Sequence, residues 1–266
     1  MDLALRITPP LLVAGRKAPR ILERKIMVYR HLWVLFLAGF FEPVFYLLSI
    51  RIGIGKLVGH VNVGGHALSY AAFAAPALLA ASAMNGAVFD STFGVFFQLK
   101  YQRSYEAILA TPVTVEALAL GEIGWALLRG LIYAAAFLIV MAAMGLVHSF
   151  WAVLALPGAT LIGFAFASVG MAATSYMRSW QDFEFVQLSI LPLFLFSATF
   201  YPLGTYPRPL QLLVQCTPLY HGVAMERALT TGTLGAGVLV HVAYLAAMGA
   251  IGVRAASRRM HGLLQP

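Results

Sequence analysis

The sequence predicts an all-α membrane protein with six transmembrane helices, and three observations lead to this fold class. Of the 266 residues, 61% are hydrophobic and only 11% are charged, whereas ordinary soluble domains contain about 25% charged residues. No Asp, Glu, Lys or Arg occurs in the 48 residues from Gly130 to Met177. About 20 apolar residues already span a bilayer, so this run must cross it twice. His148-Ser149 is the only polar break near its middle, and we expect a tight turn there.

The other apolar runs supply four more helices. The six predicted spans are residues 33–50, 68–89, 123–147, 151–176, 185–204 and 234–253. They form one membrane domain, residues 33–253, with residues 1–32 before it and the tail 254–266 after it. The glycine-rich segment 59–65 between the first two spans predicts a loop.

The basic residues are distributed unevenly between the two sides of this arrangement. Thirteen of the 18 Lys and Arg residues precede the first span, follow the last, or lie in loops on that side. The opposite side has four, which are Arg51, Lys56, Arg208 and Arg227. Because Lys and Arg are retained on the cytoplasmic side, both termini are predicted to be cytoplasmic. A cleaved signal peptide is not predicted, since the first apolar run is long enough to span and has no small-residue cleavage site behind it.

Residues 16–32 mix basic and apolar residues at helical spacing, and Ile21, Leu22 and Ile26 can share one face. Such a helix lies in the membrane interface with its basic residues at the headgroups. It can serve as a topological anchor or as a docking surface for a cytoplasmic partner.

The longest predicted cytoplasmic segment is residues 90–122. Its first half, to Ala110, predicts a short amphipathic helix that Thr111-Pro112 ends, and Thr114 can cap a new helix near Val115. A short helix across the ends of two spans can act as a lever for an external motor, or it can be an ordinary loop helix.

After the fifth span, three prolines fall between Tyr201 and Leu210, and residues 211–230 are too polar to span yet too apolar for a solvated loop. This pattern predicts short helices that re-enter the membrane from outside, buried against protein. An amphipathic helix resting on the outer leaflet is the alternative. We expect Glu226 and Arg227 near the outer boundary, paired with Arg51 or Lys56.

Three ionisable residues near or inside apolar runs need a physical reason. Glu42 precedes Pro43 in the first span, where a charge costs roughly 2.5–3.5 kcal/mol, so it should pair, stay protonated or line a substrate path. Arg129 can extend to the headgroups or pair with Glu122. Asp90 is interpreted as ending the second helix through an Asx turn.

The sequence contains no pattern typical of catalysis or of metal binding. There is no His-Glu-x-x-His or Gly-x-Ser-x-Gly, and Gly53-Ile-Gly-Lys56 lacks the spacer and the Ser or Thr of a phosphate-binding loop. The single Cys216 excludes a cysteine-based zinc site within the chain. The net charge of +8 is explained by membrane topology, so nucleic acid is not an expected partner. We therefore predict no catalytic residue, no metal site and no bound cofactor.

Several stretches resemble the permeases of ABC-2 type transporters, especially the subgroup with the nodulation lipo-oligosaccharide and daunorubicin-resistance exporters. The resemblance covers about residues 24–259 and is carried by residues 105–116, 120–130, 179–185, 192–202 and by Thr217-Pro-Leu-Tyr-His-Gly222. It implies a six-helix subunit in a bacterial cytoplasmic membrane. Such a subunit pairs with a second copy or a homologous permease and is seated on a separate ATPase that binds ATP and Mg.

The same resemblance assigns roles to segments of this chain. Residues 98–111 correspond to the coupling helix seated in the ATPase, with Arg103, Tyr105, Glu106, Leu109, Thr111 and Pro112 as the candidate contacts. Residues 207–228 correspond to a re-entrant hairpin that closes the exit, with Pro207, Pro218, Tyr220, Glu226 and Arg227 as candidate gate residues.

The aromatic residues of the fifth span, together with the scarcity of buried charge, favour an amphiphilic substrate such as a glycolipid, a lipo-oligosaccharide or a hydrophobic drug. The candidate substrate path is Glu42, Phe194, Phe196, Phe200 and Tyr201, although these rings can equally pack a dimer seam. A membrane-embedded enzyme or lipid-binding scaffold without transport is the alternative function. A channel is disfavoured because no ring of charge is evident.

Overall fold

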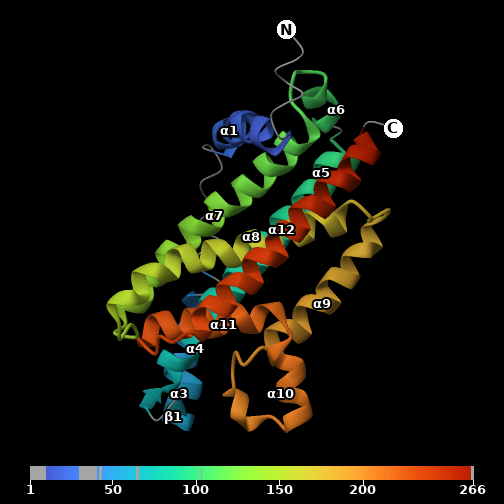
Figure 1. The fold of residues 1–266 in the computed structure, drawn as a ribbon. Coiled ribbons are helices and arrows are strands. Elements are labelled where there is room, and N and C mark those ends of the chain that lie inside the picture. Colours follow the sequence, from blue (N-terminus) through green and yellow to red (C-terminus); the bar gives the residue numbers. More distant parts are fainter. Residues whose placement is uncertain (1–9, 30–40, 42–43, 64–65, 103, 265–266) are drawn as a thin grey trace.

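The computed structural model describes residues 10–29, 41, 44–63, 66–102 and 104–264, and this part of the chain is almost entirely helical (Figure 1). Before the turn at His148-Ser149, the described helices are α1 (Pro10–Tyr29), α3 (Gly55–Val58), α4 (Tyr70–Phe89), α5 (Val95–Lys100), α6 (Ser104–Leu109) and α7 (Val115–Ala143). They are followed by α8 (Ala155–Thr174), α9 (Phe183–Phe196), α10 (Arg208–Gln215), α11 (Pro218–Thr231) and α12 (Gly237–Leu264).

Four helical segments of the described chain are long and apolar enough to cross a membrane. They are Tyr70–Lys100, Val115–Ala143, Phe150–Thr174 and Gly237–Leu263, and they correspond to the second, third, fourth and sixth predicted spans. Most of the first predicted span lies outside the described residues, although residues 44–49 are helical. The turn at His148-Ser149 is confirmed, because α7 ends at Ala143 and the next helical turn begins at Phe150.

The predicted fifth span ends earlier than the sequence indicated. Helix α9 has 14 residues and stops at Phe196 rather than at residue 204. At 1.5 Å per residue it is about 21 Å long, shorter than the roughly 30 Å hydrocarbon core. The helix stops because Ala198 takes a left-handed conformation, with φ of 55°, which a continuing helix does not allow.

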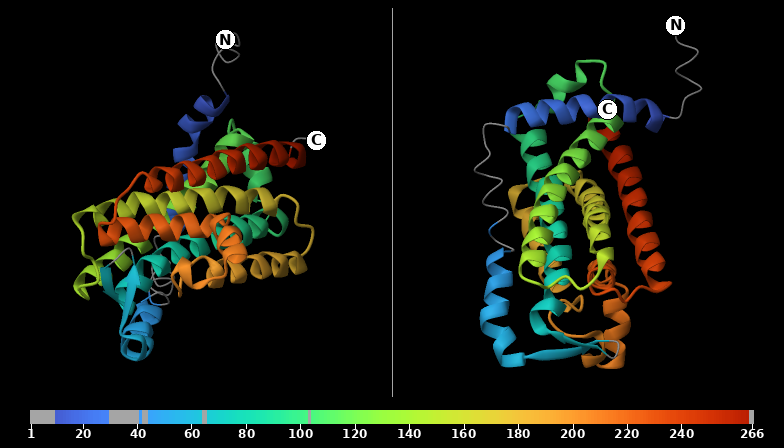
Figure 2. Two further views of the ribbon diagram at one scale, coloured as in Figure 1. Left: turned by 60° about the horizontal axis from the view of Figure 1, so that its bottom comes forward. Right: turned by 90° about the vertical axis from the view of Figure 1, so that its left-hand side faces the viewer.

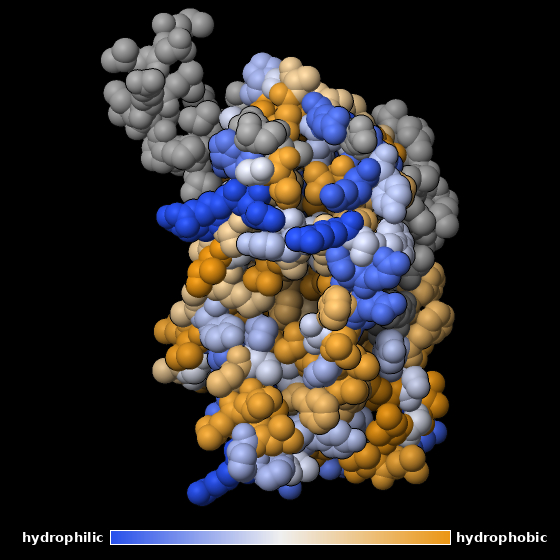
Figure 3. All heavy atoms as spheres, turned by 90° about the vertical axis from the view of Figure 1, so that its right-hand side faces the viewer, coloured by the Kyte–Doolittle hydropathy of each residue, from blue (hydrophilic) through white to orange (hydrophobic). Residues whose placement is uncertain are grey.

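The long helices run roughly side by side, and different short elements lie at their two ends (Figure 2). Helix α1 lies across one end, together with α6 and the C-terminal end of α12, and we call this the α6 end. At the other end, the α10 end, lie α3, α10 and the two strands. Figure 3 shows one side face, on which the most hydrophilic residues gather near the α6 end and hydrophobic residues are frequent over the rest.

The segment 59–65 is not a simple loop as expected. Residues His60–Val63 form β1, which pairs antiparallel with β2, His66–Ser69, with His60 opposite Ser69 and Val63 opposite His66. Alternating Val61 and Val63 suit a strand, and only Gly64-Gly65 separates the two strands, a spacing typical of a hairpin. The Ser69 hydroxyl then caps α4 by accepting a hydrogen bond from the Ala72 N–H at 3.2 Å.

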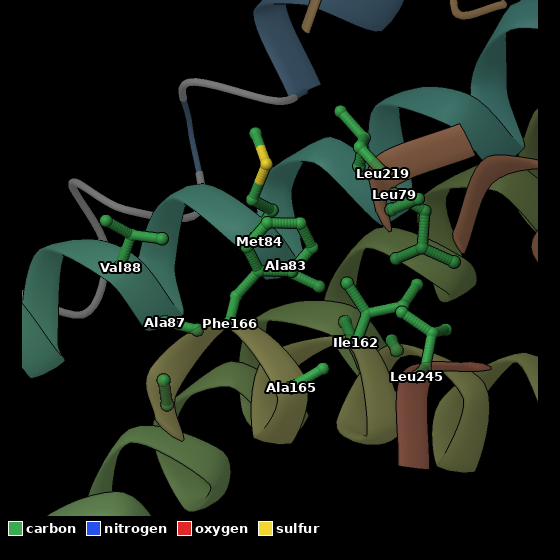
Figure 4. Packing of buried hydrophobic residues seen from close by; sticks show 14 of the residues in the cluster. Leu79, Ala83, Met84, Ala87, Val88, Ile162, Ala165, Phe166, Leu219 and Leu245 are labelled. Carbon is green, nitrogen blue, oxygen red and sulfur yellow. The ribbon is translucent and has the colours of Figure 1, made fainter. Parts of the chain in front are cut away.

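Helix α4 lies at the centre of the packing. Sixteen of its 20 residues are buried, most of them alanines, and it packs against α7, α8 and α11. Figure 4 shows Leu79, Ala83 and Met84 of α4 close to Ile162 and Phe166 of α8. In a bilayer apolar surface gives no net drive for helix association, so small side chains stabilise the pair by allowing close van der Waals contact.

A close approach also joins α1 to α7. A Cβ atom added to Gly121 of α7 would lie 2.7 Å from the Cβ of Ile21 on α1, so glycine is required for this contact. Ile21 itself is buried. The interfacial helix predicted for residues 16–32 is confirmed as a helix over Pro10–Tyr29, and its contact with α7 fixes it across the end of the bundle.

We predict opposite stability effects for two glycines on the same helix. Gly121→Ala should destabilise the protein by about 1–3 kcal/mol because the new methyl group overlaps Ile21. Gly124→Ala meets nothing within 4 Å and should be neutral or stabilise by up to about 1 kcal/mol through helix propensity. Thermal unfolding in detergent measures both variants.

The second-site variant Ile21→Ala should restore only part of the stability lost in Gly121→Ala, because it removes the overlapping Cγ2 and Cδ1 atoms but keeps the Cβ atom. Equal effects of alanine at positions 121 and 124 would contradict the close contact between α1 and α7.

Candidate coupling and gating sites

The α6 end contains a buried polar junction between three helices. Lys25 of α1 donates a hydrogen bond from Nζ to Oε2 of Glu122 on α7, at 2.5 Å, and both side chains are buried. Tyr105 of α6 is only 1% exposed. Burial raises the pKa of Tyr105 well above its usual range, and the nearby Glu122 carboxylate raises it further. The junction therefore places Tyr105 of α6 beside Glu122, the residue that pairs α7 with α1.

The predicted coupling residues divide into an anchor and an exposed surface. Tyr105 is the anchor, Leu109 is partly buried, and Glu106, Thr111 and Pro112 are exposed. Arg103 lies outside the described residues. The structure therefore brings Tyr105 to the junction with α1 and α7, while the other described members remain at the surface.

The single helix predicted up to Ala110 is wrong, because two helices occupy this segment. Helix α5 ends at Lys100, since the N–H groups of Tyr101 and Gln102 both donate to the Phe97 carbonyl, at 3.0 and 3.1 Å. Helix α6 then covers only Ser104–Leu109, and the Thr111 hydroxyl donates to the Ile108 carbonyl at 2.6 Å. The predicted start of α7 is confirmed, because the Thr114 hydroxyl accepts the Ala117 N–H.

Sequence reasoning did not identify an aromatic cluster beside this segment. Phe93, Phe96 and Tyr101 contact Trp180 and Phe183, with ring centroids 5.1–6.3 Å apart. The first three recur at spacings of three and five residues, whereas the other two lie about 80 positions later. The aromatic residues of Ser179–Phe185 were the available signal, but the pairing depends on how α8 returns the chain to α5.

A second ion pair, half-buried, corrects two predictions. Arg129 of α7 pairs with Asp90, not with Glu122. Asp90 does not end the helix, because α4 continues through a π-helical turn over Asp90–Gly94 into α5. The Thr174 hydroxyl of α8 donates to the Ser91 carbonyl in this turn, at 3.0 Å. A side-chain hydroxyl therefore provides a hydrogen-bond donor for a backbone carbonyl at the point where the α-helical hydrogen-bond pattern is interrupted.

At the α10 end, the predicted hairpin consists of two helices with different surroundings. Pro207 precedes α10, in which only Val214 is buried. Pro218 occupies the first position of α11, which packs against α4, α8 and α12. His221 of α11 and His241 of α12 share a hydrogen bond between their Nδ1 atoms, at 2.8 Å. Helix α11 is thus fixed within the bundle, and α10 lies mostly on the surface.

Glu226 and Arg227 do not pair with Arg51 or Lys56 as expected. Glu226 is completely buried, faces Gly158 of α8, and neither of its carboxylate oxygens has a hydrogen-bond partner in the described structure. Burial raises the pKa of Glu226 well above its usual range. Arg51 instead donates to the Met144 carbonyl at 3.2 Å.

Arg227 points to a different neighbourhood from Glu226. Its Nε donates to the Phe73 carbonyl at 3.2 Å and its Nη2 to the Ala198 carbonyl at 2.9 Å. The guanidinium carbon also lies 3.9 Å from the centre of the Phe73 ring, in cation–π geometry. Burial lowers the pKa of Arg227 to about 10, so the side chain stays positively charged at neutral pH.

The candidate substrate-path residues are only partly brought together. The rings of Phe194 and Phe200 meet edge to face with centroids 5.2 Å apart. Phe196 and Tyr201 are exposed, and Glu42 lies outside the described residues. Within the described part of the chain, no group of three or more His, Cys, Asp and Glu side chains could hold a metal ion.

Comparisons with known proteins agree with the resemblance. The sequence model of the ABC-2 type transporter family matches residues 20–229. "Nodulation protein J" of Rhizobium leguminosarum bv. trifolii is 35% identical over 205 residues, 77% of each chain. "Nodulation protein J" of Rhizobium leguminosarum bv. viciae is 33% identical over 77% of this chain and 78% of its own length. The "Inner membrane transport permease YadH" of Escherichia coli K12 is 27% identical over 77% of this chain and 78% of its own length.

We predict that Glu226 makes the stability of the protein depend on pH. The pKa is higher in the folded than in the unfolded state, so folding favours the protonated carboxyl. This contribution is fully present below the unfolded pKa of about 4.5 and is lost as the pH rises towards the folded pKa. The unfolding temperature of the wild type should therefore fall more between pH 5 and pH 8 than that of Glu226→Gln.

The matched control is Glu106→Gln, which removes an exposed carboxylate and should keep the pH slope of the wild type. Identical slopes for the wild type and Glu226→Gln would show that Glu226 is not held protonated by burial.

Proposed function

Because the chain belongs to the ABC-2 type transporter family, we propose that this transport permease is the membrane subunit of an ATP-driven exporter. A separate ATPase subunit binds ATP and Mg and docks at the α6 end. The observation that carries this proposal is the three-helix junction, in which the buried Tyr105 anchors α6 beside Lys25 and Glu122. A short helix fixed in this way can pass a displacement to α1 and α7 together.

The surface offered to the ATPase is formed by the outward residues of the same segment. Glu106, Thr111 and Pro112 are exposed and lie within seven residues of the anchor. Arg103 precedes α6 in the sequence and belongs to this proposed contact. A rigid anchor with a polar exposed side suits a helix that must follow a partner protein.

We propose the full arrangement of six spans with both termini in the cytoplasm. The first span precedes Ile50, and α9 with the α10–α11 hairpin forms the fifth passage and its re-entrant outer part. The described ends of α1 and α12 lie together at the α6 end, whereas the strands and α10 lie at the other. The thirteen-to-four distribution of basic residues supports the α6 end as cytoplasmic.

A second permease subunit can cover α9. This helix has no fully buried residue, and Phe185, Leu188, Leu191 and Leu195 recur every three or four positions along it and are exposed. Such a stripe packs against another helix or against lipid. A homodimer or a pair of homologous permeases would place this face and the Phe194–Phe200 pair near a shared pathway.

The proposed cargo is an amphiphile, because the pathway residues offer aromatic contact and few charges. Two relatives are named nodulation proteins and one an inner membrane transport permease. These names support export across a bacterial inner membrane and leave the class of amphiphile, whether glycolipid, lipo-oligosaccharide or drug, to experiment.

The test of this proposal is purification of the permease with a candidate ABC ATPase. The complex in lipid should hydrolyse ATP, and an amphiphilic substrate should stimulate that activity, whereas simple inorganic ions should not. An ATPase whose activity is the same with and without the permease, and which does not co-purify with it, would contradict the exporter assignment.

We predict that the charge reversals Arg103→Glu and Glu106→Lys together weaken ATPase docking roughly tenfold, because each exposed contact contributes under about 1 kcal/mol. The membrane domain should keep its unfolding temperature, since Glu106 is exposed. Co-purification and coupled ATPase activity measure the effect. Lys56→Glu, at the α10 end, is the matched control, and normal docking of the double variant would remove this segment from the interface.

We predict that both termini lie in the cytoplasm and that the strand pair lies outside. Reporter fusions at Met1 and Pro266 should both report the cytoplasm, and a reporter inserted near His60 should report the outside, because His60 lies in the strand pair at the α10 end. A cytoplasmic signal near His60 would contradict the six-span arrangement.

A further inference from the structure

A cavity of about 210 Å³ lies beside α11 at the α10 end. Its walls come from four parts of the chain: Phe73 of α4, the segment Ala198–Leu203 after α9, one face of α11, and Thr233 after α11. Drug-sized ligands occupy pockets of roughly 300–1,000 Å³, so this space suits a head group rather than a whole amphiphile.

The two faces of α11 have different roles. Tyr220, Ala224 and Arg227 recur at spacings of four and three residues and line the cavity. Leu219, Val223 and Glu226 recur at the same spacings one residue earlier and are buried in the bundle. Helix α11 therefore presents a cation to the cavity while its other face is held by α4 and α8.

The charge of Arg227 has no counter-charge in the described structure. The two ion pairs of the described residues use Lys25 with Glu122 and Arg129 with Asp90. The carboxyl of Glu226 lies on the opposite face, against Gly158. A guanidinium has five N–H donors, and the bonds to Phe73 and Ala198 use two of them. Three donors and a full positive charge remain for a ligand.

The backbone is arranged to hold this cation in place. Ala198 has a φ of 55°, which is costly for a residue other than glycine, and its carbonyl accepts the Arg227 Nη2 bond. The neighbouring Ser197 and Thr199 are buried, and Tyr70 donates to the Phe200 carbonyl at 3.2 Å. The break after α9 is thus a fixed structure that orients the guanidinium.

We propose that this cavity binds the anionic head group, a phosphate or carboxylate, of the amphiphilic cargo. Arg227 supplies the charged contact, and the hydroxyl group of Tyr220 supplies a further hydrogen bond, whereas the Thr233 hydroxyl is already bonded to that of Thr231. Pro202 and Leu203 supply apolar contact for the first carbons of the tail. That the ligand is the transported cargo rests on the proposed export function.

The test measures protection of a cysteine in the cavity wall. Thr233→Cys is introduced into a Cys216→Ser permease, purified alone in dodecyl maltoside, and labelled with a small maleimide. Dodecyl phosphate should slow the labelling, whereas inorganic phosphate and further dodecyl maltoside should not. Arg227→Gln should weaken the apparent affinity for dodecyl phosphate roughly tenfold or more, since a hydrogen bond to a charged group is lost.

Two controls separate binding from misfolding. Arg208→Gln removes a cation from the exposed part of α10 and should leave protection unchanged. Ala224→Leu fills the cavity without changing its charge and should abolish protection while Arg227 keeps its backbone bonds. Arg227→Lys should retain part of the affinity.

Three results would overturn the proposal: equal protection by inorganic phosphate, unchanged affinity in both Arg227→Gln and Ala224→Leu, or full protection by phosphatidylglycerol vesicles without dodecyl phosphate. The last result would make the cavity a site for bilayer lipid instead of cargo. The protection assay uses the permease alone. Absence of an ATPase partner would therefore contradict the proposed export function but not ligand binding in the cavity. A failed protection assay would contradict ligand binding in the cavity but not the export function.

Discussion

The close packing of small side chains around α4 is the constraint on which the rest of the structure depends. Lipid tails are as apolar as leucine, so helices in a membrane gain little from burying apolar surface and much from close contact. The alanines of α4 permit that contact with α8 on one side and α11 on another. Because α11 contacts this central helix directly, α11 is part of the core, whereas α10 lies mostly on the surface. Any motion of the proposed gate must therefore involve α10, or must shift α11 together with α4 and α8.

The two ends of the bundle handle buried charge differently. Lys25, buried at the α6 end, is paired with Glu122, and Arg129, half-buried further along α7, is paired with Asp90. Removing one partner of such a pair leaves an unpaired charge and is strongly destabilising. Two helices joined in this way are therefore expected to move together. At the α10 end, Glu226 and Arg227 are neighbours in sequence but face opposite ways, and neither is paired with an opposite charge among the described residues. The first end is built for mechanical connection, and the second retains a cation that a ligand can neutralise.

The aromatic cluster around Phe93, Phe96 and Trp180 extends this mechanical role. It connects the end of α5 with the start of α9, so the segment next to α6 contacts the helix that leads to α10 and α11. The π-helical turn at Asp90–Gly94 lies between this cluster and the buried core. A local interruption of this kind lets the α5 extension change direction without breaking α4. The proposed coupling segment is therefore joined by packed rings to the start of α9, which leads along the chain to the proposed gate.

The sequence by itself determined the membrane class, the spans of the longest uncharged runs, the tight turn at His148-Ser149, the Thr114 cap and the family, because these follow from local hydropathy, capping chemistry and contiguous motifs. It also indicated the short helices on either side of Cys216. Only the tertiary structure decided which ionisable groups meet: Asp90 pairs with Arg129, Lys25 pairs with Glu122, and Glu226 has no partner in the part of the chain that the structure describes. The reason is physical, since a buried side chain is paired according to the rotation and depth of two helices that are far apart in sequence. The early end of α9 and the left-handed Ala198 were likewise hidden from the sequence, because an apolar run does not reveal where tertiary contacts stop a helix.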